Sequence, residues 1–243
     1  AEIVATLVEN GQDPEAGVRG TWPTPLYIAV EAGHDATVKT LLRLGADPYS
    51  RIGAEASPAK LALQQGMDLE ASGLMDRFVS DAENRVELLM LAAGYGKDGL
   101  VRALVDAGAS VNGVSLKGWT ALHVAASYGD VGMVNLLLEL GANPNVVTPE
   151  GATPLDLAIF ARHSGIQRVL EPKTDRDLSL VALCFLGRTK DISRRLPEDA
   201  GEKRRALNSH SNGVTPLRAA ARSGHVELVT FLVAEGAAIE YGS

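Results

Sequence analysis

Apolar residues recur along the chain in short, helix-sized groups that are separated by polar turns. The clearest case is residues 118–145, where a first group with Leu122 on one face is followed by a leucine-rich second group at 133–140. Thr120 is a favourable N-cap residue, and Gly129 between the groups suits the left-handed conformation that ends a helix. The pattern predicts two helices of about ten residues each, which are too short to be stable alone in water. This unit therefore needs neighbours.

The same unit recurs through the chain. Its openings combine a threonine with a nearby leucine and begin at Thr24, Thr120, Thr153 and Thr215. Its ends carry a Gly-Ala turn that begins at Gly45, Gly108, Gly141 and Gly236. Thr120 and Thr153 are 33 residues apart, as are Gly108 and Gly141. A period of 33 residues with these signals is typical of a stacked helical array.

On these T-P-L-H-x-A and G-A-x-x-N motifs, the chain resembles the ankyrin-repeat family over nearly its whole length. The resemblance implies an all-α solenoid of stacked helix-turn-helix pairs with β-hairpin arms. It also implies a function in binding other proteins, with no chemistry of its own. We expect a single array over residues 1–243, with about seven repeats after a leading half repeat at 1–15.

Two steps between units are shorter than the period. Ser57 and Glu87 are 30 residues apart, and Thr153 and Val181 are 28 apart, which leaves no room for a full arm. We therefore expect irregular junctions near 80–86 and 171–180. At the second, either residues are absent or the junction itself is irregular. We expect residues 201–212, which follow, to form a polar, charged connection.

Composition suits thin helical layers, since 46% of residues are apolar but only 5% are aromatic. No apolar run reaches the length of a membrane span, so we expect no membrane insertion. A single cysteine, Cys184, excludes an internal disulfide framework and favours a reducing compartment, either cytoplasmic or nuclear. The chain begins at Ala1 inside an expected helix, and Leu228 and Leu232 of the last unit are not replaced by polar residues. We therefore expect a piece of a longer protein, with more sequence or a partner after the last unit.

Charge is unevenly distributed over the chain. The formal net charge is −7, with −9 over residues 1–172 and +3 over 173–205. An acidic solenoid argues against general nucleic-acid binding, which depends on neutralising phosphates. The basic segment is either a solvated loop or a dock for an acidic partner or phosphate. Its candidate residues are Arg194, Arg195, Lys203, Arg204 and Arg205.

No pattern in the sequence indicates an enzyme or a metal site. There is no glycine-rich phosphate loop before a lysine, no G-x-S-x-G and no H-E-x-x-H. The family resemblance implies that His123 bonds to backbone and to its neighbouring threonine. His34 and His225 follow turn glycines, whereas His163 and His210 lie in expected loops with no second ligand at metal spacing. We expect no catalytic residue, no cofactor and no metal.

The candidate binding residues are aromatic. In the family, first helices and arm tips line the concave face, and the two positions before the closing glycine of each first helix are free to vary. We expect an exposed patch at the centre of the partner interface, made of Tyr95, Trp119, Tyr128 and Phe160. Alternatively, Trp119 packs on the adjacent arm and the tyrosines only cover apolar neighbours.

The sequence therefore predicts a protein-interaction module, a scaffold or adaptor whose partner is another protein and not a nucleic acid. Two alternatives stay open. The chain is a targeting or regulatory domain of a larger enzyme or channel, or it is a structural subunit of a large assembly.

Overall fold

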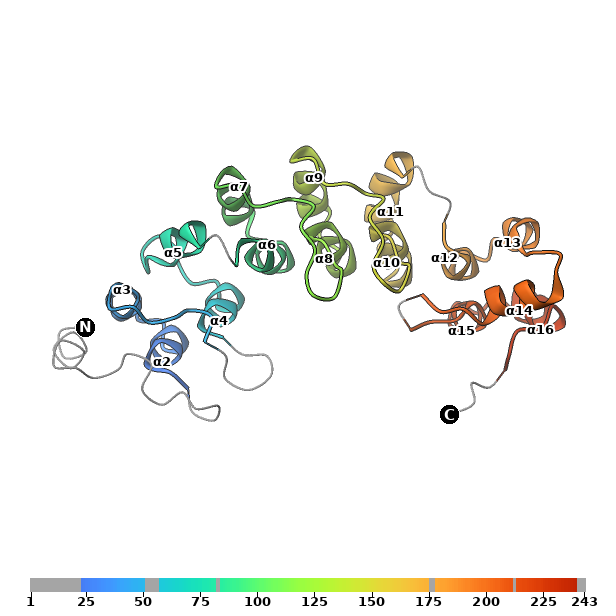
Figure 1. The fold of residues 1–243 in the computed structure, drawn as a ribbon, viewed down its shortest axis with the longest axis horizontal. Helices are drawn as coiled ribbons and strands as arrows, with labels where there is room; N and C mark the ends of the chain where they lie inside the picture. The colour runs from blue at the N-terminus through green and yellow to red at the C-terminus, as the bar shows by residue number, and fades with distance from the viewer. Residues whose placement is uncertain (1–22, 51–56, 82–83, 175–177, 212, 240–243) are drawn as a thin grey trace. The chain divides into compact units, whose positions relative to one another are not determined.

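The computed structural model describes residues 23–50, 57–81, 84–174, 178–211 and 213–239 (Figure 1). The chain divides into two compact units, residues 1–110 and 111–243. Each unit is described by itself below. The expected leading half repeat at 1–15 lies outside the described residues, and the single continuous array stays a prediction.

The first unit contains three helix pairs in its described residues. They are α2 (Pro25–Glu31) with α3 (Asp35–Arg43), α4 (Pro58–Gln65) with α5 (Leu74–Ser80), and α6 (Arg85–Gly94) with α7 (Asp98–Asp106). The first helices α2, α4 and α6 contact one another in succession, and so do the second helices α3, α5 and α7 (Figure 1). The unit is therefore two layers of antiparallel helices.

The second unit repeats this arrangement with four pairs. They are α8 (Ala121–Tyr128) with α9 (Val131–Glu139), α10 (Pro154–Phe160) with α11 (Ser164–Leu170), α12 (Leu180–Phe185) with α13 (Thr189–Arg195), and α15 (Pro216–Arg222) with α16 (Val226–Ala234). The first helices again pack in succession, α8 on α10, α10 on α12 and α12 on α15. A short 3-10 helix, η1 (Glu171–Lys173), continues α11, and the additional helix α14 (Ala200–Asn208) precedes the last pair.

Hydroxyl caps explain where the first helices begin. In six of the seven pairs, the side chain before the helix accepts a hydrogen bond from the backbone N–H three residues on; these caps are Thr24, Ser57, Thr120, Thr153, Ser179 and Thr215. Each such cap contributes about 1 kcal/mol to helix stability. Proline at the first helical position adds a preset backbone angle in α2, α4, α10 and α15.

The core is distributed between layers and is not gathered at one centre. Alanines such as Ala125 and Ala158 are fully buried where first helices approach one another, and leucines such as Leu137 fill the space beside the second helices. Full burial of one such leucine contributes about 2 kcal/mol. Stability is therefore a sum over repeats and their interfaces.

The arms between pairs are closed by turns and not by extended strands. Ser115 N donates to Trp119 O over 2.9 Å, and Thr148 N donates to Ala152 O over 2.9 Å. Among the described residues the β-structure amounts to one isolated bridge, between Ser211 and Val214. The arms before α8 and α10 are thus present as tight loops, and the described residues contain no β-ladder.

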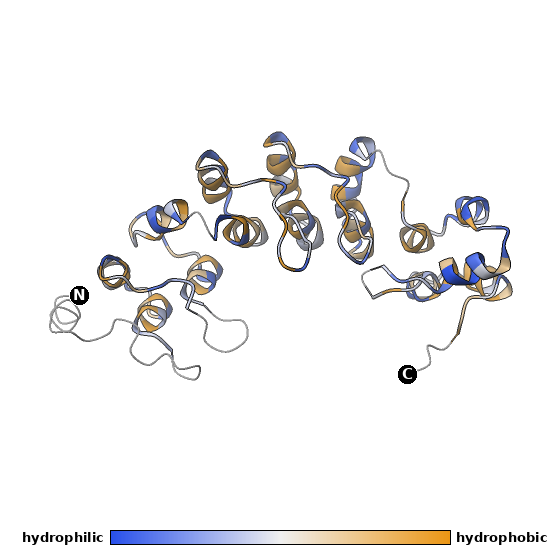
Figure 2. Cartoon of the chain, in the orientation of Figure 1, coloured by the Kyte–Doolittle hydropathy of each residue, from blue (hydrophilic) through white to orange (hydrophobic). Residues whose placement is uncertain are grey.

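The expected connection at 201–212 is wrong for most of its length, because α14 occupies Ala200–Asn208. Asp199 Oδ1 caps this helix by accepting from Glu202 N over 2.8 Å, and the buried Leu207 anchors it. Lys203 adds an ion pair of 2.8 Å with Glu235. Figure 2 shows α14 as a largely hydrophilic helix, so the apolar periodicity that identified the other helices is missing here.

Candidate functional site

Three of the four predicted aromatic residues lie where a first helix ends, whereas Trp119 precedes one, and the four differ in exposure. Tyr128 is the last residue of α8 and is 71% exposed. Phe160 is the last residue of α10 and is half-buried, and Trp119, in the turn before α8, is also half-buried. Tyr95 directly follows α6 in the first unit and is half-buried. Its alignment with Tyr128 stays a prediction, because the two residues belong to different units.

Trp119 contributes to the packing of its own arm. Its ring lies against the ring of His123, with centroids 6.1 Å apart and an angle of 44° between planes. Its backbone N–H donates to Ser115 Oγ over 3.2 Å. Trp119 thus has a packing role, as in the alternative interpretation, but its contacts are with its own arm and α8 and not with the adjacent arm.

Phe160 is a contact between repeats as well as a surface residue. Its ring packs against Phe185, the last residue of α12, with centroids 5.0 Å apart and an angle of 36°. Sequence reasoning missed Phe185, because the short step between these repeats shifts it out of the period. In the second unit, the strongly exposed member of the predicted patch is therefore Tyr128.

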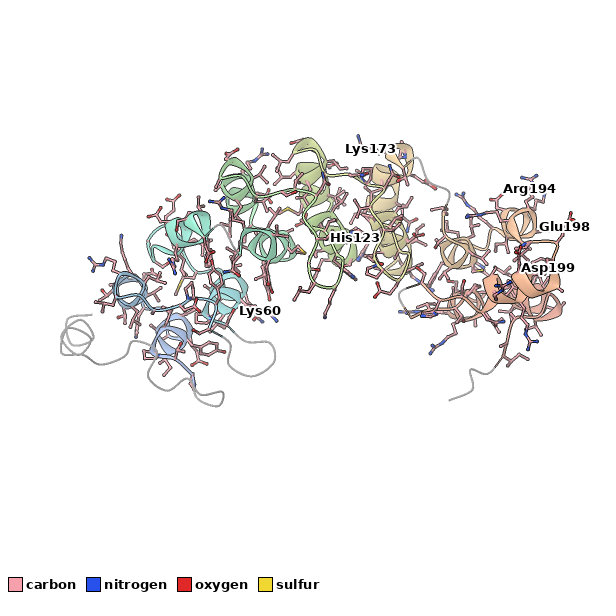
Figure 3. The ribbon with its side chains drawn as sticks, in the orientation of Figure 1. Lys60, His123, Lys173, Arg194, Glu198 and Asp199 are labelled. Atoms are coloured by element: carbon pink, nitrogen blue, oxygen red, sulfur yellow. The ribbon has the colours of Figure 1, made fainter. Side chains whose placement is uncertain are left out.

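His123 has the structural role that the sequence predicted. It is fully buried at the third position of α8 (Figure 3). Nδ1 lies 2.8 Å from Thr120 Oγ1 and accepts from Thr120 N over 3.2 Å, while Nε2 bonds to Ala152 O over 3.2 Å. Burial lowers the pKa of His123, because the charged ring would lose its hydration. The ring is thus a neutral link between α8 and the next arm.

Asp156 occupies the corresponding position in the next repeat and was missed by sequence reasoning. It is buried, at 1% exposure, and links two repeats. Its carboxylate accepts from Thr153 N and Oγ1, both over 2.9 Å, and from Ser179 Oγ over 2.9 Å and N over 3.3 Å. The sequence signal was that the repeat before the short step has an aspartate, Asp156, at the position where the preceding repeat has His123.

Two other histidines connect neighbouring repeats. His163 Nε2 bonds to Ser127 O over 3.1 Å, and His225 Nε2 bonds to Phe185 O over 3.0 Å. Each ring covers the turn glycine of the preceding repeat. His163 lies in the turn before α11, as expected, and also links its repeat to the preceding one. Across the described ranges, no group of three or more His, Cys, Asp or Glu residues is placed to hold a metal ion.

Cys184 is fully buried in α12, and burial raises the pKa of its thiol to about 12. A buried thiol with so high a pKa is a poor nucleophile. Cys184 therefore acts as a small core residue.

The five predicted basic residues lie on two helices, α13 and α14. Arg194 lies on α13, where it is exposed and 3.7 Å from Asp191 (Figure 3), and Arg195 donates to Leu178 O. Lys203 is paired with Glu235 on α16, while Arg204 and Arg205 are exposed on α14. Internal partners thus offset much of the positive charge.

The structure therefore defines a class of protein, because each unit is a stack of paired helices. Sequence profiles of ankyrin repeats match this chain, the three-copy profile over residues 60–148 and 89–179 and the single-repeat profile over 24–52 and 212–241. The chain belongs to the ankyrin-repeat family, whose repeats generally mediate protein–protein interaction and are typically non-enzymatic.

One relative is the transient receptor potential cation channel subfamily A member 1 homolog of Caenorhabditis elegans. It is 31% identical over 104 residues, which cover 41% of this chain and 8% of that protein. This chain thus spans a small part of the length of the relative. No helix within the described ranges is both long and apolar enough to cross a bilayer.

Proposed function

We propose that the second unit binds a partner protein on the layer of first helices, the face predicted to be concave, with Tyr128 as an anchor. The observation that carries this proposal is the 71% exposure of Tyr128 at the end of a helix whose other apolar residues are largely buried. The repeat gains little stability from so exposed a ring. Tyrosine is enriched at the centres of protein interfaces, because it combines a large apolar face with a hydrogen-bonding tip.

The surroundings of Tyr128 are fixed by contacts between repeats. His163 holds the carbonyl of the adjacent Ser127, and Phe160 is fixed against Phe185. A surface that is already ordered loses little conformational entropy when a partner binds. The mechanism is therefore passive: a preformed surface buries side chains of the partner without rearrangement.

The test is to isolate partners by pull-down and mass spectrometry and to measure the affinity of each for the Tyr128→Ala variant. We expect binding to weaken about tenfold or more, since loss of a central aromatic anchor costs about 2 kcal/mol. Folding should be unaffected, because the side chain is exposed. Val226→Ala removes a side chain of 69% exposure from the other helix layer and is the matched control.

The opposite result is equally clear. If Tyr128→Ala binds normally while charge reversal at Arg194 and Arg195 abolishes binding, the basic segment is the binding surface. The four aromatic residues would then only cover the stack.

A second candidate function is that of a targeting or regulatory domain within a larger channel. The likeness to the cation channel homolog favours it. Sequencing the full-length transcript tests this function, because a channel requires membrane-spanning segments in the same open reading frame. A complete reading frame that holds only ankyrin repeats would contradict it.

A further inference from the structure

Arg162 stands at a position where every other described helix pair has glycine. The turn between paired helices requires a positive φ, and glycine supplies it at Gly33, Gly66, Gly96, Gly129, Gly187 and Gly224, with φ between 63° and 87°. Arg162 adopts a φ of 62° between α10 and α11. It is the one described residue other than glycine with a positive φ. An L-residue is strained in this conformation because its Cβ crowds the backbone, and such strain persists where other contacts hold the residue in place.

That side chain reaches across to a repeat that is not the next one in sequence. Arg162 Nη2 donates to the carbonyl oxygen of Arg222, 60 residues away at the end of α15, over 3.1 Å. The bond satisfies a carbonyl that α15 leaves without a helical partner. It uses one of the five N–H donors of the guanidinium and fixes its position, so the remaining donors are available to an external acceptor.

Arg162 and the two arginines of α15 have no acidic partner among the described residues. Arg218 and Arg222 are four residues apart, on one side of α15, and Arg162 is attached to the backbone of Arg222. All three side chains are exposed, and none forms an ion pair in the described part of the chain. Arg188, Arg194 and Lys203, in contrast, each have a carboxylate partner. Like charges at this spacing destabilise a helix, so the arrangement is better suited to binding an anion than to stabilising the stack.

Arg162 lines a hollow of mixed polarity where α10, α12 and α15 end. A pocket of about 250 Å³ is lined by Ile159, Phe185 and Leu186, with Arg162, Ser223 and His225 at its polar side. Phe185 is the residue against which Phe160 packs. Tyr128, Phe160, Phe185 and Arg222 are the last residues of α8, α10, α12 and α15, which pack in succession. The hollow and Arg162 therefore lie along the same edge of the first-helix layer as Tyr128.

We propose that this surface recognises an acidic, extended segment of a partner protein. An apolar side chain of that segment occupies the hollow, and its carboxylates bind Arg162, Arg218 and Arg222. Arginine and carboxylate form paired, charge-assisted hydrogen bonds, which give both strength and orientation. The inference rests on the proposed function, because it assigns the chemistry of the partner to the same face. A nucleic acid is disfavoured, because a chain of net charge −7 repels a long polyanion.

The test uses the whole 243-residue chain and a displayed library of random peptides. We expect the enriched peptides to combine aspartate or glutamate with an apolar residue. A synthetic copy of one such peptide should bind in fluorescence anisotropy and weaken as salt rises. A single-stranded oligouridylate is measured beside it; selective binding of that RNA, or enrichment of peptides without acidic residues, would overturn the inference.

Variants separate the arginines from the general charge of the protein. Arg162→Gly restores the usual turn residue, so it should melt at the same or a higher temperature while the peptide binds about tenfold more weakly. The double variant Arg218→Gln/Arg222→Gln should weaken binding similarly. Arg204→Gln/Arg205→Gln removes the same charge from α14 and should leave binding unchanged.

The same peptide distinguishes failure of this inference from failure of the proposed function. If Tyr128→Ala weakens binding and the arginine variants do not, the surface is correct but the acidic partner is wrong. If neither set of variants weakens binding, both are wrong.

Discussion

The junction between α8 and α10 and the junction between α10 and α12 each link neighbouring repeats through a buried side chain, but the two side chains bond to different groups. Between α8 and α10 an arm is present, and His123 bonds to the carbonyl of Ala152 at its end. Between α10 and α12 the step is short, and Asp156 instead accepts from the N–H and hydroxyl of Ser179, the cap of the next helix. The linking side chain thus matches the group that the next repeat presents. A ring nitrogen bonds to a carbonyl oxygen at the regular junction, and a carboxylate accepts from an N–H and a hydroxyl at the short one.

Two adjacent residues before the short junction, Arg162 and His163, contact repeats on opposite sides of their own. His163 reaches the repeat directly before its own, at Ser127. Arg162, one residue earlier, reaches α15, two helix pairs further on. In the second unit, the regular repeats therefore carry the aromatic end of the proposed surface and the short junction carries its basic end.

Removing the link at the short junction should have the largest effect. Asp156→Ala deletes four accepted hydrogen bonds and leaves buried donors unsatisfied, so we expect a loss of about 3 kcal/mol in the free energy of unfolding. Asp130→Ala is the control, because it removes a single helix cap, the bond from Met133 N over 2.9 Å, and should cost about 1 kcal/mol. Urea denaturation measures both; equal losses would mean that Asp156 is an ordinary cap.

The link at the regular junction should be weaker and sensitive to pH. His123→Ala should cost about 2 kcal/mol at neutral pH, because buried hydrogen bonds are lost. Burial holds the pKa of His123 below that of an unfolded histidine, so the unfolded chain binds the proton first as pH falls. The contribution of His123 is complete above about pH 6.5 and declines below it. Urea unfolding across this range should show a steeper acid-side loss in the wild type than in His123→Asn, and parallel curves would contradict the role of burial.

The features of the fold that could be predicted from the sequence are those that depend on interactions between residues close together in the chain. Threonine caps, turn glycines and apolar periodicity are local, so the sequence predicted the helix pairs and the structural role of His123. Helix α14 was missed because its charged sequence lacks the apolar period and depends on Asp199, Leu207 and the Lys203–Glu235 pair.

The candidate site was harder to predict than the fold. The exposure of Tyr128 agrees with the predicted position, but the packing of Trp119 on His123 and of Phe160 on Phe185 depends on neighbouring segments. The approach of Arg162 to Arg222 depends on how α10, α12 and α15 pack. No local pattern contains that information.

The position of His163 over the turn at Gly129 predicts that two glycine-to-alanine substitutions differ in their effect on the free energy of unfolding. Gly129 and Gly141 have φ of 87° and 91°, so alanine is strained at both. A Cβ at Gly129 would also approach the ring of His163 to 2.8 Å, whereas nothing lies within 4 Å of one at Gly141. Gly129→Ala should therefore lose about 1 kcal/mol more than Gly141→Ala. Equal losses in urea denaturation would show that His163 moves aside freely.

The smallest expected effect has the opposite sign. Arg162→Gly removes the backbone strain of a left-handed residue but also the bond to Arg222, so we expect a net gain of up to about 1 kcal/mol. Differential scanning calorimetry measures it. A clear loss of stability would mean that Arg162 holds α10 and α15 together and is not retained for binding.

The location of the bound partner is best tested by NMR, through amide chemical shifts of the whole chain with and without the selected acidic peptide. Binding at the proposed surface predicts that the largest shifts fall at 127–130, 160–163, 185–187 and 222–225, where the first helices of the second unit end. Residues of α9, α11 and α16 should change little. Shifts concentrated at 191–205 would instead place the partner on the basic segment and contradict an interface centred on Tyr128.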